Sequence, residues 1–138
     1  MAESFNNYLT GAKYSLDQAR TIVPRAGSSI DSDIGVGSRL TDAVTQLHSI
    51  YVTKEISGNH INDPYNYAVF ITIAIYDYNT QKSYPVAQNV MVLPHSSFYI
   101  EKAITLTPQQ ELILTYTSAN SSDSGTNIYT VCSSVDIS

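Results

Sequence analysis

Residues 67–78 read Tyr67-Ala-Val-Phe-Ile-Thr-Ile-Ala-Ile-Tyr-Asp-Tyr78, and this stretch decides the fold. Every second residue from Val69 to Ile75 is a β-branched aliphatic, the spacing that places side chains on one face of a strand. The alternate positions, from Phe70 to Tyr78, carry mainly aromatic and small residues, so the second face is also largely apolar. We therefore predict a central strand that is covered on both sides or lies at an interface.

Further strand patterns lie on either side of this stretch, separated by polar or proline-containing turns. On the N-terminal side we predict a strand over 44–56 and a short one over 20–23, although Ser15 could instead cap a short helix over 15–20. A hairpin turn is predicted at 79–82. Beyond it, strands are predicted over 84–93, 98–106, 111–118 and 127–137. In the strand over 98–106 the inward positions are Phe98, Ile100, Ile104 and Leu106. In the strand over 111–118 they are Leu112, Leu114 and Tyr116.

This succession of strands predicts an all-β fold, an antiparallel two-sheet sandwich of jelly-roll or Ig-like topology, with the strand order left open. Residues 40–138 form the predicted sandwich domain. Residues 1–39 contain several breakers and end in a loop-like stretch over 26–38, so we predict an extended N-terminal arm. Polar arms are seldom ordered alone, and we expect this one to lie on a neighbouring subunit. Deleting residues 1–20 should then weaken assembly without unfolding the sandwich.

The composition bounds the function. The chain has 138 residues with 43% hydrophobic but only 14% charged residues, against about 25% charged in an average soluble domain. Its net charge is −5, and the seven basic residues are scattered singly, so direct binding of nucleic acid is not expected. The N-terminal residues do not resemble a secretory signal, and the longest apolar run is too short to span a bilayer, so no membrane role is expected.

No residues show the spacing of a metal or cofactor site. His48, His60 and His95 lie in three different segments, which favours surface or turn histidines over metal ligands. Asp31 and Asp33 faintly resemble a calcium loop but lack its further ligands, so we interpret them as part of a solvated loop. We predict neither metal nor cofactor.

Catalytic motifs are likewise missing from the sequence. Cys132, the single cysteine, alternates with strand residues, and no motif supplies a base, so we expect a packed or interface thiol. Asp77, Glu101 and Glu111 could form a carboxylate pair for glycoside cleavage only if the fold brought them together; outward-facing strand charges are the simpler reading. We therefore predict that the protein is not an enzyme and has no catalytic residues.

The tyrosines, eleven in number, are the feature for which a binding role competes with a packing role. A tyrosine combines a large ring with a polar tip and suits half-wet surfaces. Those near residues 65–84 could pack the second face of a sheet, line a subunit contact or form a sugar-binding platform. The candidate interface residues are Phe5, Tyr8, Leu9, Tyr14, Tyr65, Tyr67, Tyr76, Tyr78 and Tyr84.

The order of strands and turns resembles that of small virion structural proteins of tailed bacteriophages, those of marine and cyanobacterial phages above all. The segments that carry the likeness are 5–12, 48–53, 69–77, 84–92, the turn Pro94-His-Ser-Ser97, 106–112 and 131–137. Most of the chain is covered, but by strand and turn types rather than by an invariant motif. Gln109-Gln110 stands where a turn glycine would be expected.

The resemblance implies a β-sandwich module of the virion. It implies first a capsid decoration or cement protein, a homotrimer or other homo-oligomer bound to the major capsid protein. A neck, tail or fibre-adaptor protein is the alternative within the virion. A carbohydrate-binding module that uses exposed tyrosines is the alternative outside that class.

Overall fold

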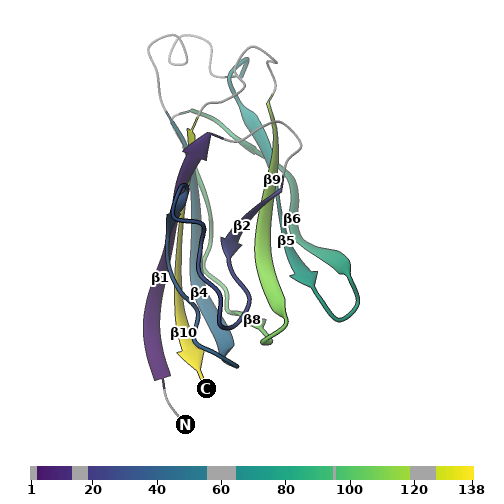
Figure 1. Ribbon diagram of the computed structural model, residues 1–138. Helices are drawn as coiled ribbons and strands as arrows, with labels where there is room; N and C mark the ends of the chain where they lie inside the picture. Colours follow the sequence, from purple (N-terminus) through teal and green to yellow (C-terminus); the bar gives the residue numbers. More distant parts are fainter. Residues whose placement is uncertain (1–2, 14–18, 56–64, 95, 119–126) are drawn as a thin grey trace.

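The computed structural model describes residues 3–13, 19–55, 65–94, 96–118 and 127–138. Two antiparallel sheets pack face to face, and the described ends of the chain lie close together at one end of the sandwich (Figure 1). The predicted all-β class and the two-sheet sandwich are confirmed.

Within the described residues, ten strands make up the sheets. They are β1 (Glu3–Lys13), β2 (Arg20–Val23), β3 (Gly35–Val36), β4 (Val44–Lys54), β5 (Val69–Asp77), β6 (Lys82–Val92), β7 (Ser97–Ile100), β8 (Ile104–Leu106), β9 (Gln110–Ser118) and β10 (Asn127–Ile137).

The strand order is that of a jelly roll. Sheet A has the order β3-β1-β10-β4-β7, with β8 also paired to β4, and sheet B has the order β2-β9-β5-β6. If β3 is set aside and β7 and β8 count as one interrupted strand, four strands remain in each sheet. Only β5 and β6 then follow each other within one sheet, so the other connections cross between sheets. This topology selects the jelly roll from the two predicted alternatives.

The predicted strands match the observed ones closely. β5 lies between β9 and β6, and Val69, Ile71 and Ile73 are buried on its inner face. The short predicted strand over 20–23 is β2, and the predicted hairpin turn joins β5 to β6 with Gln81 at φ 57°. The single strand predicted over 98–106 is instead two strands, since Glu101–Ala103 interrupt it. Residues 15–18, which belong to the alternative helix, lie outside the described residues.

The core fills the space between the sheets with side chains from the inner positions. Sheet A contributes Leu47, Ile50 and Val52 from β4 and Ile128 from β10, and sheet B contributes Leu112, Leu114 and Tyr116 from β9 along with the β5 row. Each full burial of such a side chain is worth roughly 1.5–3 kcal/mol. Period-two burial therefore supplies the main favourable term that holds the two sheets together.

The N-terminal residues do not form the predicted arm. β1 pairs with β10 over its whole length, from Glu3 opposite Ile137 to Lys13 opposite Asn127. β2 belongs to sheet B, and β3 pairs with β1, so residues 1–39 contribute to both sheets. The division into an arm and a separate sandwich domain is thus wrong for this chain, because β1, β2 and β3 belong to its own sheets. The contact of these residues with a neighbouring subunit stays a prediction. The pattern misled because the inner face of β1 is polar, with Tyr8 and Thr10 buried.

A polar network closes the end of the sandwich near the C-terminus. Arg39 is 2% exposed and donates from Nη1 to the carbonyls of Pro24 and Gln110, and from Nη2 to those of Ala43, Leu106 and Thr107. These carbonyls belong to segments of both sheets, so Arg39 ties the sheets together.

Asp136 balances this buried cation with a buried anion. Its carboxylate accepts hydrogen bonds from Asn6, Thr45, the Tyr8 hydroxyl and the Leu40 backbone. Asp136 is fully buried, and a buried carboxylate is tolerated when its oxygens accept several hydrogen bonds in this way. Desolvation lowers the pKa of Arg39, while the nearby Tyr8 and Asp136 oppose that shift. The network therefore anchors β1, β4 and β10 to one another at this end.

Candidate interaction surfaces

An apolar row crosses the outer face of sheet A. The strand register places five side chains directly opposite one another across five strands. In order across the sheet they are Val36, Leu9, Val131, Tyr51 and Tyr99. We call these residues the apolar row.

The row is open to solvent in the single chain. Val36 is 61% exposed and Tyr99 58%, while Leu9 and Val131 are close to 40%. On the same face, Phe5 of β1 is 81% exposed and is separated from Leu9 by the outward-facing Asn7. Contiguous exposed apolar side chains on a sheet mark an interaction surface more often than scattered ones do.

The face around the row is almost uncharged. The outward positions on β10 and β4 that oppose each other hold Ser133 with Ser49 and Tyr129 with Thr53. Among the outward side chains that the structure describes on β1, β4, β7 and β10, Glu3 alone is an Asp, Glu, Lys or Arg, and Glu101, directly after β7, adds a carboxylate at the Tyr51 end of the row. A chain with net charge −5 thus presents one face on which charge repulsion is weak.

Two aromatic contacts organise the row and its border. The rings of Tyr51 and Tyr99 stack with centroids 5.9 Å apart, and the Tyr51 hydroxyl donates to Glu101 at 2.8 Å. That hydrogen bond raises the pKa of Tyr51. The Tyr129 ring lies over Gly11, where a Cβ would come within 2.5 Å of it. A larger residue at position 11 would therefore displace the Tyr129 ring from this position.

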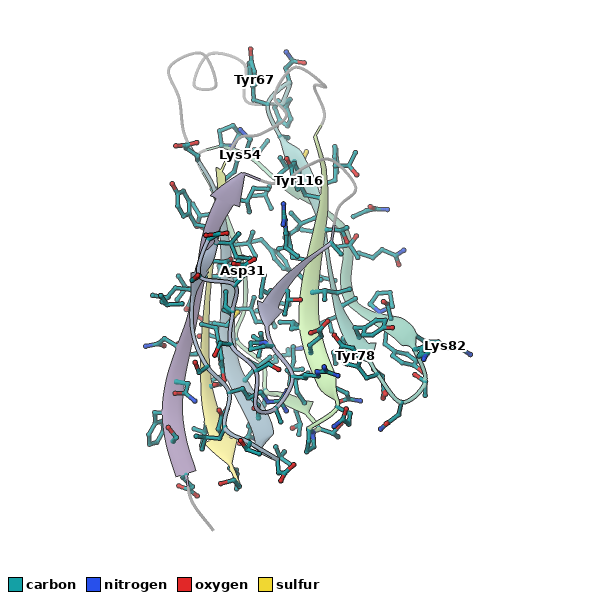
Figure 2. All side chains as sticks on the ribbon, in the orientation of Figure 1. Asp31, Lys54, Tyr67, Tyr78, Lys82 and Tyr116 are labelled. Atoms are coloured by element: carbon teal, nitrogen blue, oxygen red, sulfur yellow. The ribbon has the colours of Figure 1, made fainter. Side chains whose placement is uncertain are left out.

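A groove lies over the outer face of sheet B. Two hollows of about 380 and 500 Å³ share the lining residues Ala19, Thr21, Tyr78 and Glu111, so they are continuous. The first extends along the 24–34 segment to Asp31, and the second extends to Tyr76. Figure 2 labels Asp31 and Tyr78, which come from different parts of the chain. We call this feature the tyrosine groove.

The polar groups of the groove are held in place by one another. The Tyr76 and Tyr78 rings meet edge to face at 4.9 Å, and the Arg25 guanidinium lies 4.3 Å from the centre of the Tyr78 ring. The Tyr78 hydroxyl donates to Oε1 of Glu111 at 3.1 Å. Desolvation raises the pKa of Glu111, although the Tyr78 hydrogen bond and Arg25 act in the opposite direction. The groove thus combines ring surface with a half-buried carboxyl.

The predicted interface residues fall into several groups. Phe5 and Leu9 lie exposed on the outer face of sheet A, but Tyr8 is fully buried and hydrogen-bonded to Asp136, so it cannot be an interface residue in this fold. Its hydroxyl satisfies a buried carboxylate, which explains the inward direction. Tyr14 lies outside the described residues.

The tyrosines near β5 do not form one cluster. Tyr76 and Tyr78 meet in the groove. Tyr84 opposes Ile75 while Tyr76 opposes Ser83, so Tyr84 and Tyr76 point to opposite faces of sheet B. Tyr65 and Tyr67 precede β5, whose length of nine residues separates them from Tyr78 by roughly 25 Å. Figure 2 shows Tyr67 and Tyr78 far apart.

Sequence reasoning missed most of the apolar row. Val36, Tyr51, Tyr99 and Val131 come from four strands, and their adjacency depends on a register that periodicity does not give. The last strand held the available signal. Tyr129, Val131, Val135 and Ile137 were predicted to share one face, and the buried residues Ile128, Thr130 and Cys132 alternate with Tyr129 and Val131, so the predicted face is the outer one, on which Val135 alone of the four is buried.

The residues considered for catalysis are a buried thiol and carboxylates on two different sheets. Cys132 is fully buried, and desolvation raises the pKa of its thiol to about 12, as for a packed thiol. Glu101 lies on sheet A beside Tyr51, whereas Asp77 and Glu111 belong to sheet B. Within the described residues, no three His, Cys, Asp or Glu side chains form a group that could hold a metal ion. The described part of the chain also has no helix that could cross a membrane.

The chain has distant structural likenesses but no sequence match. No protein-family model and no curated protein matches it. It is similar to a chain in the structure of infectious bursal disease virus Gt strain, with 8% identity and a TM-score of 0.45 over 98% of this chain. It spans 32% of that virus chain. It is also similar to the CBM22-1 xylan-binding domain of Xyn10C from Paenibacillus barcinonensis, with 12% identity, a TM-score of 0.34 and coverage of 91% and 90%. At these scores neither likeness carries a functional argument.

Proposed function

We propose that the protein is a non-enzymatic structural module that assembles with copies of itself through the outer face of sheet A. The observation that carries this proposal is the apolar row, which crosses five strands without an intervening charged side chain. Free sheet faces of soluble proteins ordinarily carry polar and charged residues.

A second copy fits this face better than a strongly charged partner does. Two chains of net charge −5 repel each other over most approaches, and the repulsion is weakest where both present uncharged surface. A two-fold contact would place the row against itself, since such interfaces are self-complementary. Aromatic side chains such as Tyr51 and Tyr99 are enriched at the centres of interfaces.

The setting we propose for this assembly is the virion of a tailed bacteriophage, as the resemblance to small phage structural proteins implies. On a capsid the protein would act as a decoration or cement protein beside the major capsid protein. It would stabilise the shell by the difference between its binding free energies for assembled and for free capsid subunits. Copy number per particle separates this role from a neck or tail role, with hundreds expected for the capsid and a dozen or fewer for the neck or tail.

The decisive experiment for assembly compares two lysine substitutions by sedimentation and light scattering. Val131 lies in the row and is 41% exposed, and Met91 lies on the outer face of sheet B and is 45% exposed. Val131→Lys buries an unpaired ammonium in the contact and should weaken self-association at least about 30-fold, equivalent to about 2 kcal/mol. Met91→Lys should leave association unchanged.

The same experiment can defeat the proposal. A wild-type chain that stays monomeric at millimolar concentration would rule out assembly through this face, as would equal association of the two lysine variants. Because the contact is apolar, association should persist in 1 M salt, at which charge interactions are screened within about 3 Å. Dissociation by salt would contradict an apolar contact.

A carbohydrate-binding role is the second candidate. It would use the tyrosine groove of sheet B instead of the row on sheet A, and one chain can carry both surfaces.

A further inference from the structure

The tyrosine groove has features that self-assembly through sheet A leaves unexplained. It lies on the opposite sheet from the apolar row, and its lining mixes aromatic rings with hydroxyl, carboxyl and guanidinium groups. Cross-strand pairing brings Ser83, Tyr76 and Glu111 side by side on β6, β5 and β9. Adjacent to them, Thr21 of β2 opposes Ile113 of β9. Rigid strands therefore position the lining.

We propose that this groove binds an uncharged oligosaccharide. Sugars present two kinds of surface, patches of C–H groups that pack on aromatic rings and hydroxyls that donate and accept hydrogen bonds. Tyr76 and Tyr78 supply ring surface, and their edge-to-face contact fixes the ring orientations. Glu111 accepts hydroxyl hydrogens, and the Arg25 guanidinium donates to hydroxyl oxygens.

The shape of the groove favours an extended chain over a single sugar. Its two hollows together run from Asp31 past Tyr78 and Glu111 to Ser83. Both are broadly open to solvent in the described structure, so a polymer could enter without a free chain end. Ligand sites of several hundred cubic ångströms are of ordinary size for recognising small molecules, and two in a row fit several linked sugar units.

The charges of the groove argue against anionic ligands. Glu111 and Asp31 line it together with Arg20 and Arg25, so the lining has no excess of positive charge with which to bind a phosphate or a nucleic acid backbone. The lining is too rich in polar groups for an apolar ligand. An uncharged but hydroxyl-rich molecule satisfies both conditions.

Glu111 is the residue we expect to hold the ligand by hydrogen bonding. Its Oε1 accepts the Tyr78 hydroxyl, and its Oε2 is a second acceptor on the same carboxyl group. The raised pKa of Glu111 shows that folding disfavours its ionised form, as at many functional sites.

The test uses the full chain on a printed array of neutral and acidic glycans, followed by titration with the strongest neutral hit. Tyr76→Ala and Glu111→Gln should each weaken binding about tenfold or more, because each removes a contact worth one charged hydrogen bond or one aromatic platform. Tyr84→Ala is the matched control, since Tyr84 is an exposed tyrosine on the opposite face of the same sheet. It should bind as the wild type does.

Specific outcomes would overturn the inference. They are an array with no neutral glycan bound, a preference for acidic glycans, or a Tyr84→Ala loss equal to that of Tyr76→Ala. Far-ultraviolet circular dichroism of each variant separates lost binding from lost folding. Val131→Lys tests the sheet A contact separately, because a chain that no longer self-associates should still bind the glycan. Failure of one proposal is therefore distinguishable from failure of the other.

Discussion

Arg39 offers the sharpest test of how the two sheets are held together. Its two terminal nitrogens carry four hydrogens and reach five backbone carbonyls, so one hydrogen is shared. A lysine at this position keeps the charge but has three hydrogens on one nitrogen. Arg39→Lys therefore loses at least two of the five hydrogen bonds.

The magnitude follows from that count. Hydrogen bonds to a charged group are worth about 1.5–3 kcal/mol each, and the lower figure applies because Thr107 also accepts from the backbone of Gln110. Two lost bonds give about 3 kcal/mol for Arg39→Lys. Arg39→Met removes all five and leaves Asp136 without its nearby cation, so it should cost clearly more than Arg39→Lys. A domain of this size has a total stability of about 5–15 kcal/mol.

Urea unfolding followed by tyrosine fluorescence measures these differences. A loss of 3 kcal/mol should also lower Tm by about 12 °C, at about 4 °C per kcal/mol for a chain of this length. Arg25→Lys, on an exposed arginine, is the control and should change stability by less than about 0.5 kcal/mol. If the free energy of unfolding of Arg39→Lys lies within 1 kcal/mol of the wild-type value with an unchanged m-value, the Arg39 hydrogen bonds do not hold the sheets together.

Three further predictions concern buried groups and the N-terminal strand. Cys132 should resist alkylation at pH 8 in the native protein and react at once in denaturant, and native reaction at the free-thiol rate would contradict its burial. Burial raises the pKa of Tyr8 to about 12 from 10.0, so its contribution to stability is complete below pH 10 and is lost as pH rises through 12. Between pH 10 and pH 12 the free energy of unfolding, measured with urea, should therefore fall by up to about 2 kcal/mol more in the wild type than in Tyr8→Phe. Equal falls in the two proteins would refute this. A chain lacking residues 1–20 should lose cooperative unfolding, since β10 then loses its partner along one whole edge, and a sharp native-like transition would restore the arm hypothesis.

The strands were predictable where one face is purely apolar. β5 and β9 alternate aliphatic residues with others. Ile71 of the predicted aliphatic row and Leu114, predicted to face inward, are both buried. Period-two burial is a local property of sequence, so it can be seen without knowledge of the neighbouring strands.

β1 and Arg39 were not predictable for the opposite reason. The inner face of β1 is built from Tyr8, Thr10 and Asn6, which are satisfied by Asp136 and Thr130 on a strand more than 100 residues away. Arg39 read as one scattered surface charge, yet it meets carbonyls from four segments. A polar residue is tolerated in a core only when the tertiary structure supplies its hydrogen-bond partners. No local sequence pattern predicts which distant residues those partners are.

The corrected position of β1 also changes how the assembly must be tested. Phe5 and Leu9 belong to the outer face of sheet A because β1 is paired within its own chain. The N-terminal residues therefore contribute to the proposed contact as part of the sheet and not as an arm exchanged with another subunit. Loss of assembly after N-terminal truncation would therefore follow from unfolding, from loss of the face or from loss of an exchanged arm. A point substitution on β10 such as Val131→Lys avoids this ambiguity, because it changes the face while the whole β1–β10 ladder remains.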